Sequence, residues 1–150
     1  MGFTFSIPRA QNVDGRDLSE VEVKLIVAIA LFPIDHALRY GYDHEYGGVY
    51  RDGVADQSVL VYDKEWWQNF ESLVGFLNGY KRYGDSRYLE AFLQTWTFIR
   101  RCFLNMAVGE SRQLLKQDGT PIISNMGNAW KGIYHTGRAL AEGLRRLDDV

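Results

Sequence analysis

The sequence predicts an all-α fold of antiparallel helical hairpins joined by short β-hairpin loops. Four stretches repeat apolar residues every three or four positions, N-cap residues and glycines stand at their expected ends, and extended segments fill the intervals. The chain has 150 residues, of which 46% are hydrophobic. That length and composition suit one domain with a buried core, or a piece of a larger one.

The first helix is expected after an irregular lead-in over residues 1–15. Asp17, with Glu20 three positions later, resembles a capping box, and apolar residues then recur with a helical period to about Tyr40. Pro33 lies inside this stretch and predicts a kink or break, because proline lacks the N–H that bonds to the preceding turn. The longest apolar run of the chain lies here, is too short to span a bilayer, and indicates a buried helix.

Three further helices follow. The second is expected to begin near Asp63 and to end at Gly84, and Asp85 is a suitable N-cap for the third. The fourth covers roughly residues 132–147. Apolar residues at helical spacing are, in order, Trp66, Phe70, Leu73, Leu77 and Tyr80; Leu89, Phe92, Leu93, Trp96, Ile99 and Phe103; and Leu140, Leu144 and Leu147.

Two Asp-Gly pairs, at residues 52–53 and 118–119, lie between extended segments and predict hairpin turns. Each pair lies between an incoming and an outgoing helix, so the same unit occurs twice. Helical hairpins of this kind need neighbours, and four helices fit either a small bundle or an arc of a closed helical toroid. The aromatic content of 14% favours the arc, because sugar-binding clefts place flat rings against pyranoses.

Composition excludes several classes of partner. The formal charge is -2, which gives little reason to expect a nucleic-acid or an anionic-membrane surface. Cys102 is the single cysteine and cannot form an internal disulfide, which fits a reducing compartment, so a cytoplasmic location is expected. The three histidines form no HxxxH or HExxH pattern, and no glycine-rich phosphate loop is present, so we expect no metal site.

The first candidate site residues are Trp67 and Glu71. They are four positions apart on a helix and therefore lie on one face. An aromatic ring beside a carboxylate suits a sugar, because the ring stacks on the pyranose and the carboxylate accepts hydrogen bonds from hydroxyls. The alternative is that Trp66 and Trp67 are core aromatics and that Glu71 is solvated or paired with a cation.

The second candidate group runs from Trp130 to Arg138. His135 lies in the first turn of the fourth helix, where unpaired N–H groups and the positive end of the helix dipole disfavour a protonated imidazole. His135 is therefore a candidate general base. Arg138, three positions later, could bind a substrate oxygen or a carboxylate that lies next to the substrate site. The alternative is an ion pair between Arg138 and Glu142, four positions further along the same helix.

Four stretches, read together, resemble the N-acylglucosamine 2-epimerase and cellobiose 2-epimerase family. They are Tyr42-Asp43-His44-Glu45-Tyr46-Gly47-Gly48-Val49-Tyr50, Asp63-Lys64-Glu65-Trp66-Trp67-Gln68-Asn69-Phe70-Glu71, Gly84-Asp85-Ser86-Arg87-Tyr88-Leu89 and Trp130 to Arg138. The similarity covers residues 20–148 and matches the C-terminal part of the family. It implies an (α/α)6 barrel, of which residues 16–150 would be the C-terminal portion.

The resemblance also implies a reaction. Family members open the sugar ring, remove the proton at C2, pass through an enediolate and return the proton, so they epimerise C2 or interconvert aldose and ketose. Two histidines on opposite faces of C2 share this chemistry, and His135 matches the second of them. Trp67 and Trp130 match sugar-stacking positions, Glu71 matches a contact to a substrate hydroxyl, and Arg138 matches an arginine that supports the substrate site from behind. The implied substrate is a mono- or disaccharide, and no metal or redox cofactor is implied.

The sequence also departs from the family pattern in the number of helices and in its histidines. An (α/α)6 barrel needs more helices than the four predicted here, and neither His36 nor His44 fits the motif of the first catalytic histidine. We therefore expect a truncated member that is inactive alone and prone to self-association. The alternatives are a non-catalytic sugar-binding or assembly module, and a glycoside hydrolase for which Glu71 and Glu110 are candidates by residue type only.

Overall fold

The computed structural model describes residues 19–54 and 58–148. The expected lead-in over residues 1–15 and Asp17 lie outside the described residues. Four α-helices follow one another: α1 (Glu20–His36), α2 (Trp66–Tyr83), α3 (Ser86–Phe98) and α4 (Tyr134–Leu147). A π-helical segment extends α1 over Ala37–Gly41 and another extends α3 over Ile99–Phe103.

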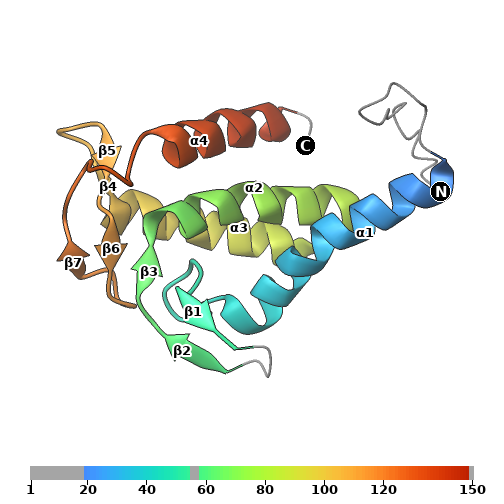
Figure 1. Cartoon of the computed structure of the whole chain (residues 1–150), viewed down its shortest axis with the longest axis horizontal. Coiled ribbons are helices and arrows are strands. Elements are labelled where there is room, and N and C mark those ends of the chain that lie inside the picture. The colour runs from blue at the N-terminus through green and yellow to red at the C-terminus, as the bar shows by residue number, and fades with distance from the viewer. Residues whose placement is uncertain (1–18, 55–57, 149–150) are drawn as a thin grey trace.

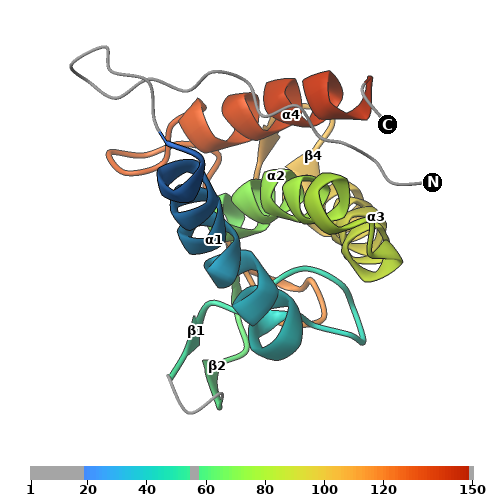
Figure 2. The same ribbon diagram turned by 90° about the vertical axis from the view of Figure 1, so that its right-hand side faces the viewer.

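Helix α2 lies at the centre of the molecule. Helices α1, α3 and α4 all pack against it, and successive helices run in opposite directions (Figures 1 and 2). The predicted helical hairpins are confirmed. The arrangement matters for the site because it brings the beginnings of α2 and α4 to the same end of the molecule.

The first helix differs from the prediction at its N-cap, and it is not broken at Pro33. Its N-cap is Ser19, whose Oγ accepts a hydrogen bond from the N–H of Glu22, while the Glu22 carboxylate accepts from the N–H of Ser19 at 2.8 Å. The prediction that Asp17 and Glu20 form the capping box is therefore wrong, because Ser19 and Glu22 satisfy the same pattern two positions later. Pro33 does not break the helix, which continues to His36 and then widens into the π-helical segment.

The junction between α2 and α3 is confirmed. Gly84 has a φ of 66°, in the left-handed region that favours glycine, and its N–H donates to the Tyr80 carbonyl at 2.8 Å. Asp85 then caps α3, since its carboxylate accepts from the N–H of Arg87 at 3.0 Å.

Short strands occupy the end of the molecule where α2 and α4 begin (Figure 1). They form three antiparallel sheets: β1 (Asp52–Gly53) with β2 (Val59–Val61); β3 (Lys64–Glu65), β6 (Leu114–Leu115) and β7 (Pro121–Ile123) in the order β3-β6-β7; and β4 (Leu104–Asn105) with β5 (Glu110–Ser111).

The two Asp-Gly pairs behave differently. The turn at residues 118–119 is confirmed, because Gly119 has a φ of 93° and connects the paired strands β6 and β7. The prediction of a turn at residues 52–53 is wrong. That pair forms β1, which pairs with β2, and the Val54 N–H donates to the Ser58 carbonyl at 3.0 Å. The pairing of Asp52 with Val61 places Asp52 and Gly53 in the ladder of an antiparallel pair and not in its turn.

The core lies where α2 and α3 meet the β-hairpins. Among the residues whose burial is described, the apolar side chains with no exposed surface are Phe70, Phe76, Leu77, Ile99, Phe103 and Leu115. The helical spacing identified most of this face, but not all of it is buried: Leu93 is 52% exposed, and Leu144 on α4 is 67% exposed. The apolar ridge of α4 is therefore only partly covered by the described residues.

A buried ion pair joins the segment between the π-helical end of α1 and β1 to strand β3, which leads into α2. The Lys64 ammonium lies 2.6 Å from Asp43 Oδ2 and 2.7 Å from the Gly47 carbonyl oxygen, and both charged side chains are almost completely buried. It also lies 3.9 Å from the centre of the Phe98 ring. Burial opposes ionisation of Asp43, but hydrogen bonds from Lys64 and from backbone N–H groups outweigh it, so the pKa of Asp43 is lowered. Lys64 belongs to β3, which directly precedes α2, so the pair ties Asp43 to the beginning of that helix.

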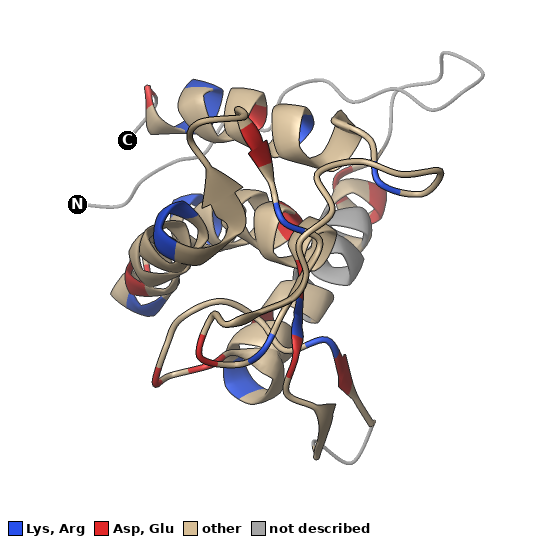
Figure 3. Cartoon of the chain, turned by 90° about the vertical axis from the view of Figure 1, so that its left-hand side faces the viewer, with Lys and Arg blue, Asp and Glu red and all other residues tan. Residues whose placement is uncertain are grey.

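Charge is mixed throughout the described elements. Figure 3 shows Lys and Arg interspersed with Asp and Glu along the helices and hairpins. Among the described helices, none combines the length and the hydropathy that a bilayer crossing requires.

Candidate functional site

Glu71 and His135 are 64 positions apart in the sequence and form a hydrogen bond in the structure. His135 Nδ1 lies 2.9 Å from Glu71 Oε1, and the side chains are 36% and 28% exposed. Arg138, one turn further along α4, donates to the other carboxylate oxygen, Glu71 Oε2. Packing of α4 against α2 therefore assembles a polar cluster that remains accessible from outside.

Aromatic rings surround the imidazole of His135. The Trp67 ring lies 5.8 Å away, centre to centre, at an angle of 42°, and the Tyr134 ring lies 5.0 Å away, edge to face. The Trp66 ring lies 6.3 Å away, also edge to face. These contacts restrict the orientation of the imidazole on the surface of α2.

The hydrogen bond to Glu71 has a chemical consequence. An ionised carboxylate only accepts hydrogen bonds, so the proton of the neutral imidazole is on Nδ1 and the lone pair is on Nε2. An imidazole oriented by a carboxylate in this way can take a proton at Nε2 and return it. The arrangement suits general acid–base chemistry.

Trp66 and Trp67 lie in different environments. Trp66 is 5% exposed and belongs to the core, whereas Trp67 is 41% exposed beside His135. One tryptophan is thus a core aromatic and the other lies at the polar cluster. Glu71 is paired with a cation, as the alternative stated, but its partners come from α4.

The alternative pairing of Arg138 with Glu142 is not observed. Glu142 instead pairs with Arg145, at 3.1 Å, and with Arg146, both further along α4. Arg138 reaches across to Glu71 on α2. It therefore contacts the same carboxylate that contacts His135.

Trp130 lies in a different environment from Trp67. It is 91% exposed, on the segment that joins β7 to α4, and its backbone N–H donates to Asn128 Oδ1 at 2.8 Å. The described residues bury little of its indole ring. Its predicted role in sugar stacking stays a prediction.

Glu110, Lys131 and Thr136 form a second polar cluster at the beginning of α4 that the residue patterns did not reveal. The Lys131 ammonium lies 3.3 Å from Glu110 Oε1, and Thr136 Oγ1 donates to the same oxygen at 3.3 Å. The sequence did contain both residues in stretches that had been singled out, since Glu110 was a candidate by residue type and Lys131 directly follows the candidate Trp130. Spacing in the sequence could not show that the two motifs meet.

The pKa of Glu110 bears on the hydrolase alternative. Burial opposes its ionisation, but the Ser111 N–H at 2.6 Å and the Lys131 ammonium outweigh that effect, so the pKa of Glu110 is lowered. A glycosidase general acid needs a raised pKa. The lowered pKa of Glu110 does not match that requirement.

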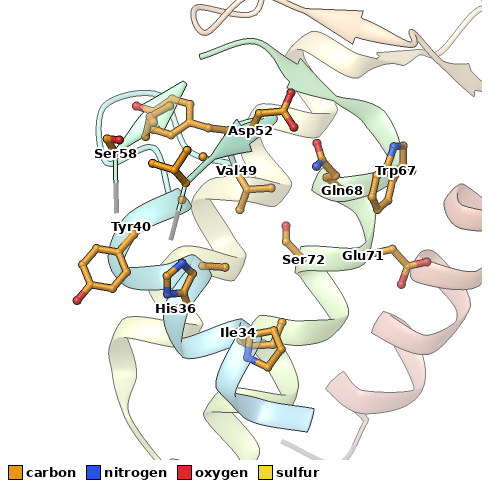
Figure 4. Close-up of a pocket in the computed structure, with 17 residues that line it drawn as sticks. Ile34, His36, Tyr40, Val49, Asp52, Ser58, Trp67, Gln68, Glu71 and Ser72 are labelled. Carbon is orange, nitrogen blue, oxygen red and sulfur yellow. The ribbon is translucent and has the colours of Figure 1, made fainter. Parts of the chain in front are cut away.

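A pocket of about 590 Å³ adjoins the Glu71 cluster. It lies between the end of α1, the β1–β2 hairpin and the first turns of α2, and Trp67 and Glu71 line it on the side nearest α4 (Figure 4). Its wall also includes His36, Tyr40 and Gln68. Within the part of the chain that the structure describes, no group of three or more His, Cys, Asp or Glu is arranged to hold a metal ion.

Two solved structures that superimpose on this chain are a sugar epimerase and a sugar isomerase. A cellobiose 2-epimerase from Spirochaeta thermophila DSM 6192 is 29% identical and superimposes with a TM-score of 0.67, over 90% of this chain and 33% of that one. A D-mannose isomerase is 27% identical with a TM-score of 0.68, over 74% of this chain and 28% of that one. These enzymes are (α/α)6 barrels, so the four helices form an arc of such a barrel, as expected.

Comparisons of sequence agree with the comparisons of structure. The N-acylglucosamine 2-epimerase of Bos taurus is 31% identical over 114 residues, which are 73% of this chain and 27% of that protein. The chain thus spans about a quarter of the length of this curated relative. The family model for N-acylglucosamine 2-epimerase (GlcNAc 2-epimerase) matches residues 19–139, which include Trp67, Glu71, His135 and Arg138. The chain therefore belongs to the N-acylglucosamine 2-epimerase family.

Proposed function

We propose that the chain supplies one proton-transferring face of a sugar 2-epimerase or aldose–ketose isomerase. The observation that supports this most strongly is the hydrogen bond between His135 and Glu71, with the exposed Trp67 ring beside it. The proposed substrate is a ring-opened mono- or disaccharide, and the reacting atom is its C2.

Each residue of the cluster has a proposed role. His135 removes the proton from C2 through Nε2, which leaves an enediolate, and later returns a proton to the same face. Glu71 holds the imidazole in the required tautomer, and Arg138 holds Glu71. A carboxylate has about four acceptor positions, so Glu71 can still accept from a substrate hydroxyl as well. Trp67 and Trp130 stack on the sugar. The proton leaves and returns to carbon without a net change of oxidation state, so the proposal needs no redox cofactor.

Inversion at C2 requires a donor on the opposite face as well. The chain contains three histidines, and the other two are His36, in ring contact with Tyr40 at 5.0 Å, and His44, in ring contact with Tyr42 at 4.9 Å. Neither belongs to the His135 cluster. We propose that this chain alone exchanges the C2 proton with retention and does not invert C2.

The test is hydrogen exchange in heavy water. The purified chain is incubated separately with cellobiose, mannose and N-acetylmannosamine, and deuterium at C2 is measured by NMR together with the formation of the epimer or the ketose. We expect deuterium incorporation that His135→Ala abolishes, and no net epimer. Net formation of the epimer would overturn the single-face proposal, because inversion at C2 needs a donor on the opposite face. Absence of exchange, with sugar binding unaffected by His135→Ala, would overturn the catalytic one.

The exposed apolar ridge of α4 favours a second candidate, a non-catalytic assembly module. Leu144 and Leu147 are 67% and 42% exposed there, and exposed apolar patches promote association. Light scattering after size-exclusion chromatography tests this candidate. A monodisperse monomer that Leu144→Lys leaves unchanged would count against it.

A further inference from the structure

The beginning of α4 lacks the support that helices usually have. Its N-cap position is Ile133, which provides no side-chain hydrogen bond to the free N–H groups of the first turn. His135 lies in that turn, and the segment before it, from residue 124, is mostly exposed and without regular structure. The first turn of α4 therefore has no side-chain cap of its own to hold it in place.

Glu110 provides that support from strand β5. Its Oε1 accepts hydrogen bonds from the N–H of Ser111 at 2.6 Å and from the Ser111 hydroxyl at 3.1 Å, which hold the carboxylate on the strand. The same oxygen contacts the Lys131 ammonium and the Thr136 hydroxyl, each at 3.3 Å. Lys131 and Thr136 lie on the two sides of His135 in the sequence. One carboxylate oxygen thus holds both ends of the segment that carries the imidazole.

Lys131 is buried to a degree that is unusual for a lysine. Its side chain is 0% exposed, and the ammonium also donates to the Met126 carbonyl at 3.1 Å and lies 5.3 Å from the centre of the Trp66 ring. Burying an ammonium group costs free energy that a pair with a carboxylate only partly offsets, so such a pair is weak evidence for added stability. Here it links β5, the segment before α4 and the core face of α2, which are the elements around His135.

We propose that Glu110 and Lys131 are positioning residues for His135, which hold the first turn of α4 so that the imidazole meets Glu71 and Trp67. Neither residue touches the reacting atoms. The inference rests on the proposed function, because it assigns these residues a purpose only if His135 transfers protons.

The test measures the imidazole directly and needs no turnover. The full chain is labelled with ¹⁵N and ¹³C, and His135 is identified among the three histidines by comparison with His135→Asn. Two signals are recorded: the ring ¹⁵N pattern, which shows which nitrogen carries the proton, and the nuclear Overhauser cross-peaks between His135 and Trp67. Glu110→Gln alone leaves an unpaired buried cation, so the principal variant is Glu110→Gln with Lys131→Met. The control is Glu142→Gln, which also replaces a glutamate by glutamine but lies on α4, after His135.

We expect the double variant to remain folded by circular dichroism and to lose both the Nδ1-protonated pattern and the cross-peaks to Trp67, while Glu142→Gln keeps both. A folded double variant with unchanged His135 signals would overturn the proposal. If the double variant does not fold, Thr136→Val, which removes a single contact to Glu110, decides by the same signals. Glu71→Ala separates the two claims: if the ring ¹⁵N pattern survives it, the proposed catalytic pair is wrong, whereas the cross-peaks to Trp67 still decide the positioning role.

Discussion

Replacing Asp43 by Asn removes the negative charge that neutralises a completely buried ammonium group. The side chains of Lys64 and Asp43 are 0% and 1% exposed, and their charged atoms are 2.6 Å apart. An asparagine at position 43 can still accept hydrogen bonds from the N–H groups of Glu45 and Tyr46, which now lie 2.9 and 3.2 Å from Asp43 Oδ1. The turn is therefore retained, and the substitution isolates the loss of the charge.

The expected cost follows from the burial of the pair. Removing one partner of a buried ion pair destabilises a protein by about 3–5 kcal/mol, because the remaining charge is left without compensation. A domain of this size has a free energy of unfolding of about 5–15 kcal/mol, and each kcal/mol shifts its Tm by roughly 2–4 °C. We therefore expect the Tm of Asp43→Asn to fall by about 6–20 °C. The contacts of Lys64 with the Gly47 carbonyl and the Phe98 ring remain and favour the lower part of this range.

Thermal and urea unfolding followed by circular dichroism measure the change. Asp85→Asn is the matched control, because it breaks an exposed pair with Arg87 while asparagine remains a good N-cap, and we expect no measurable change. Adding Lys64→Met to Asp43→Asn removes the unpaired cation and should recover part of the loss. A Tm for Asp43→Asn within error of the wild type would refute the reasoning, as would a double variant less stable than the single one.

Three further outcomes are expected. Trp66→Ala should lower the free energy of unfolding by about 3–5 kcal/mol in urea, since Trp66 is 5% exposed. Trp67→Ala removes an exposed ring and should change stability little, but it should weaken sugar binding in calorimetry. Equal effects of the two variants on stability would contradict this division of roles. Gly119→Ala should lower the Tm, because the residue has a φ of 93° and a Cβ there would overlap the Sγ of Cys102; an unchanged Tm would show that the turn relaxes freely. The pKa of Asp43 is lowered in the folded chain, so its contribution to stability is complete above its ordinary pKa of 3.8 and is lost as the pH falls through its pKa in the folded state. The free energy of unfolding should therefore fall less steeply in acid for Asp43→Asn than for the wild type. Parallel curves of stability against pH would contradict this.

The candidate site could be assembled from the sequence only in part. The spacing of Trp67 and Glu71 placed them on one helical face, and the position of His135 placed it at a helix start. The family resemblance named the same residues, but nothing in the residue spacing showed that Glu71 meets His135 and Arg138 instead of leaving Arg138 to pair with Glu142. The contacts of Glu110 with Lys131 and Thr136 were hidden for the same reason, since they join segments that are distant in the chain.

The sequence by itself determined the features that depend on neighbouring residues. Helical periods, the cap at Asp85, the end at Gly84 and the turn at Gly119 follow from local hydrogen bonding and allowed φ values, which a few adjacent residues set. The local pattern gave a wrong prediction where two capping-box patterns lay two residues apart, as at Ser19. It also did so where an Asp-Gly pair lay inside a strand ladder, as at Asp52. Only the tertiary structure decided which carboxylate faces which cation and which tryptophan is exposed, because those outcomes depend on how α4 packs against α2, and packing joins groups that no sequence spacing connects.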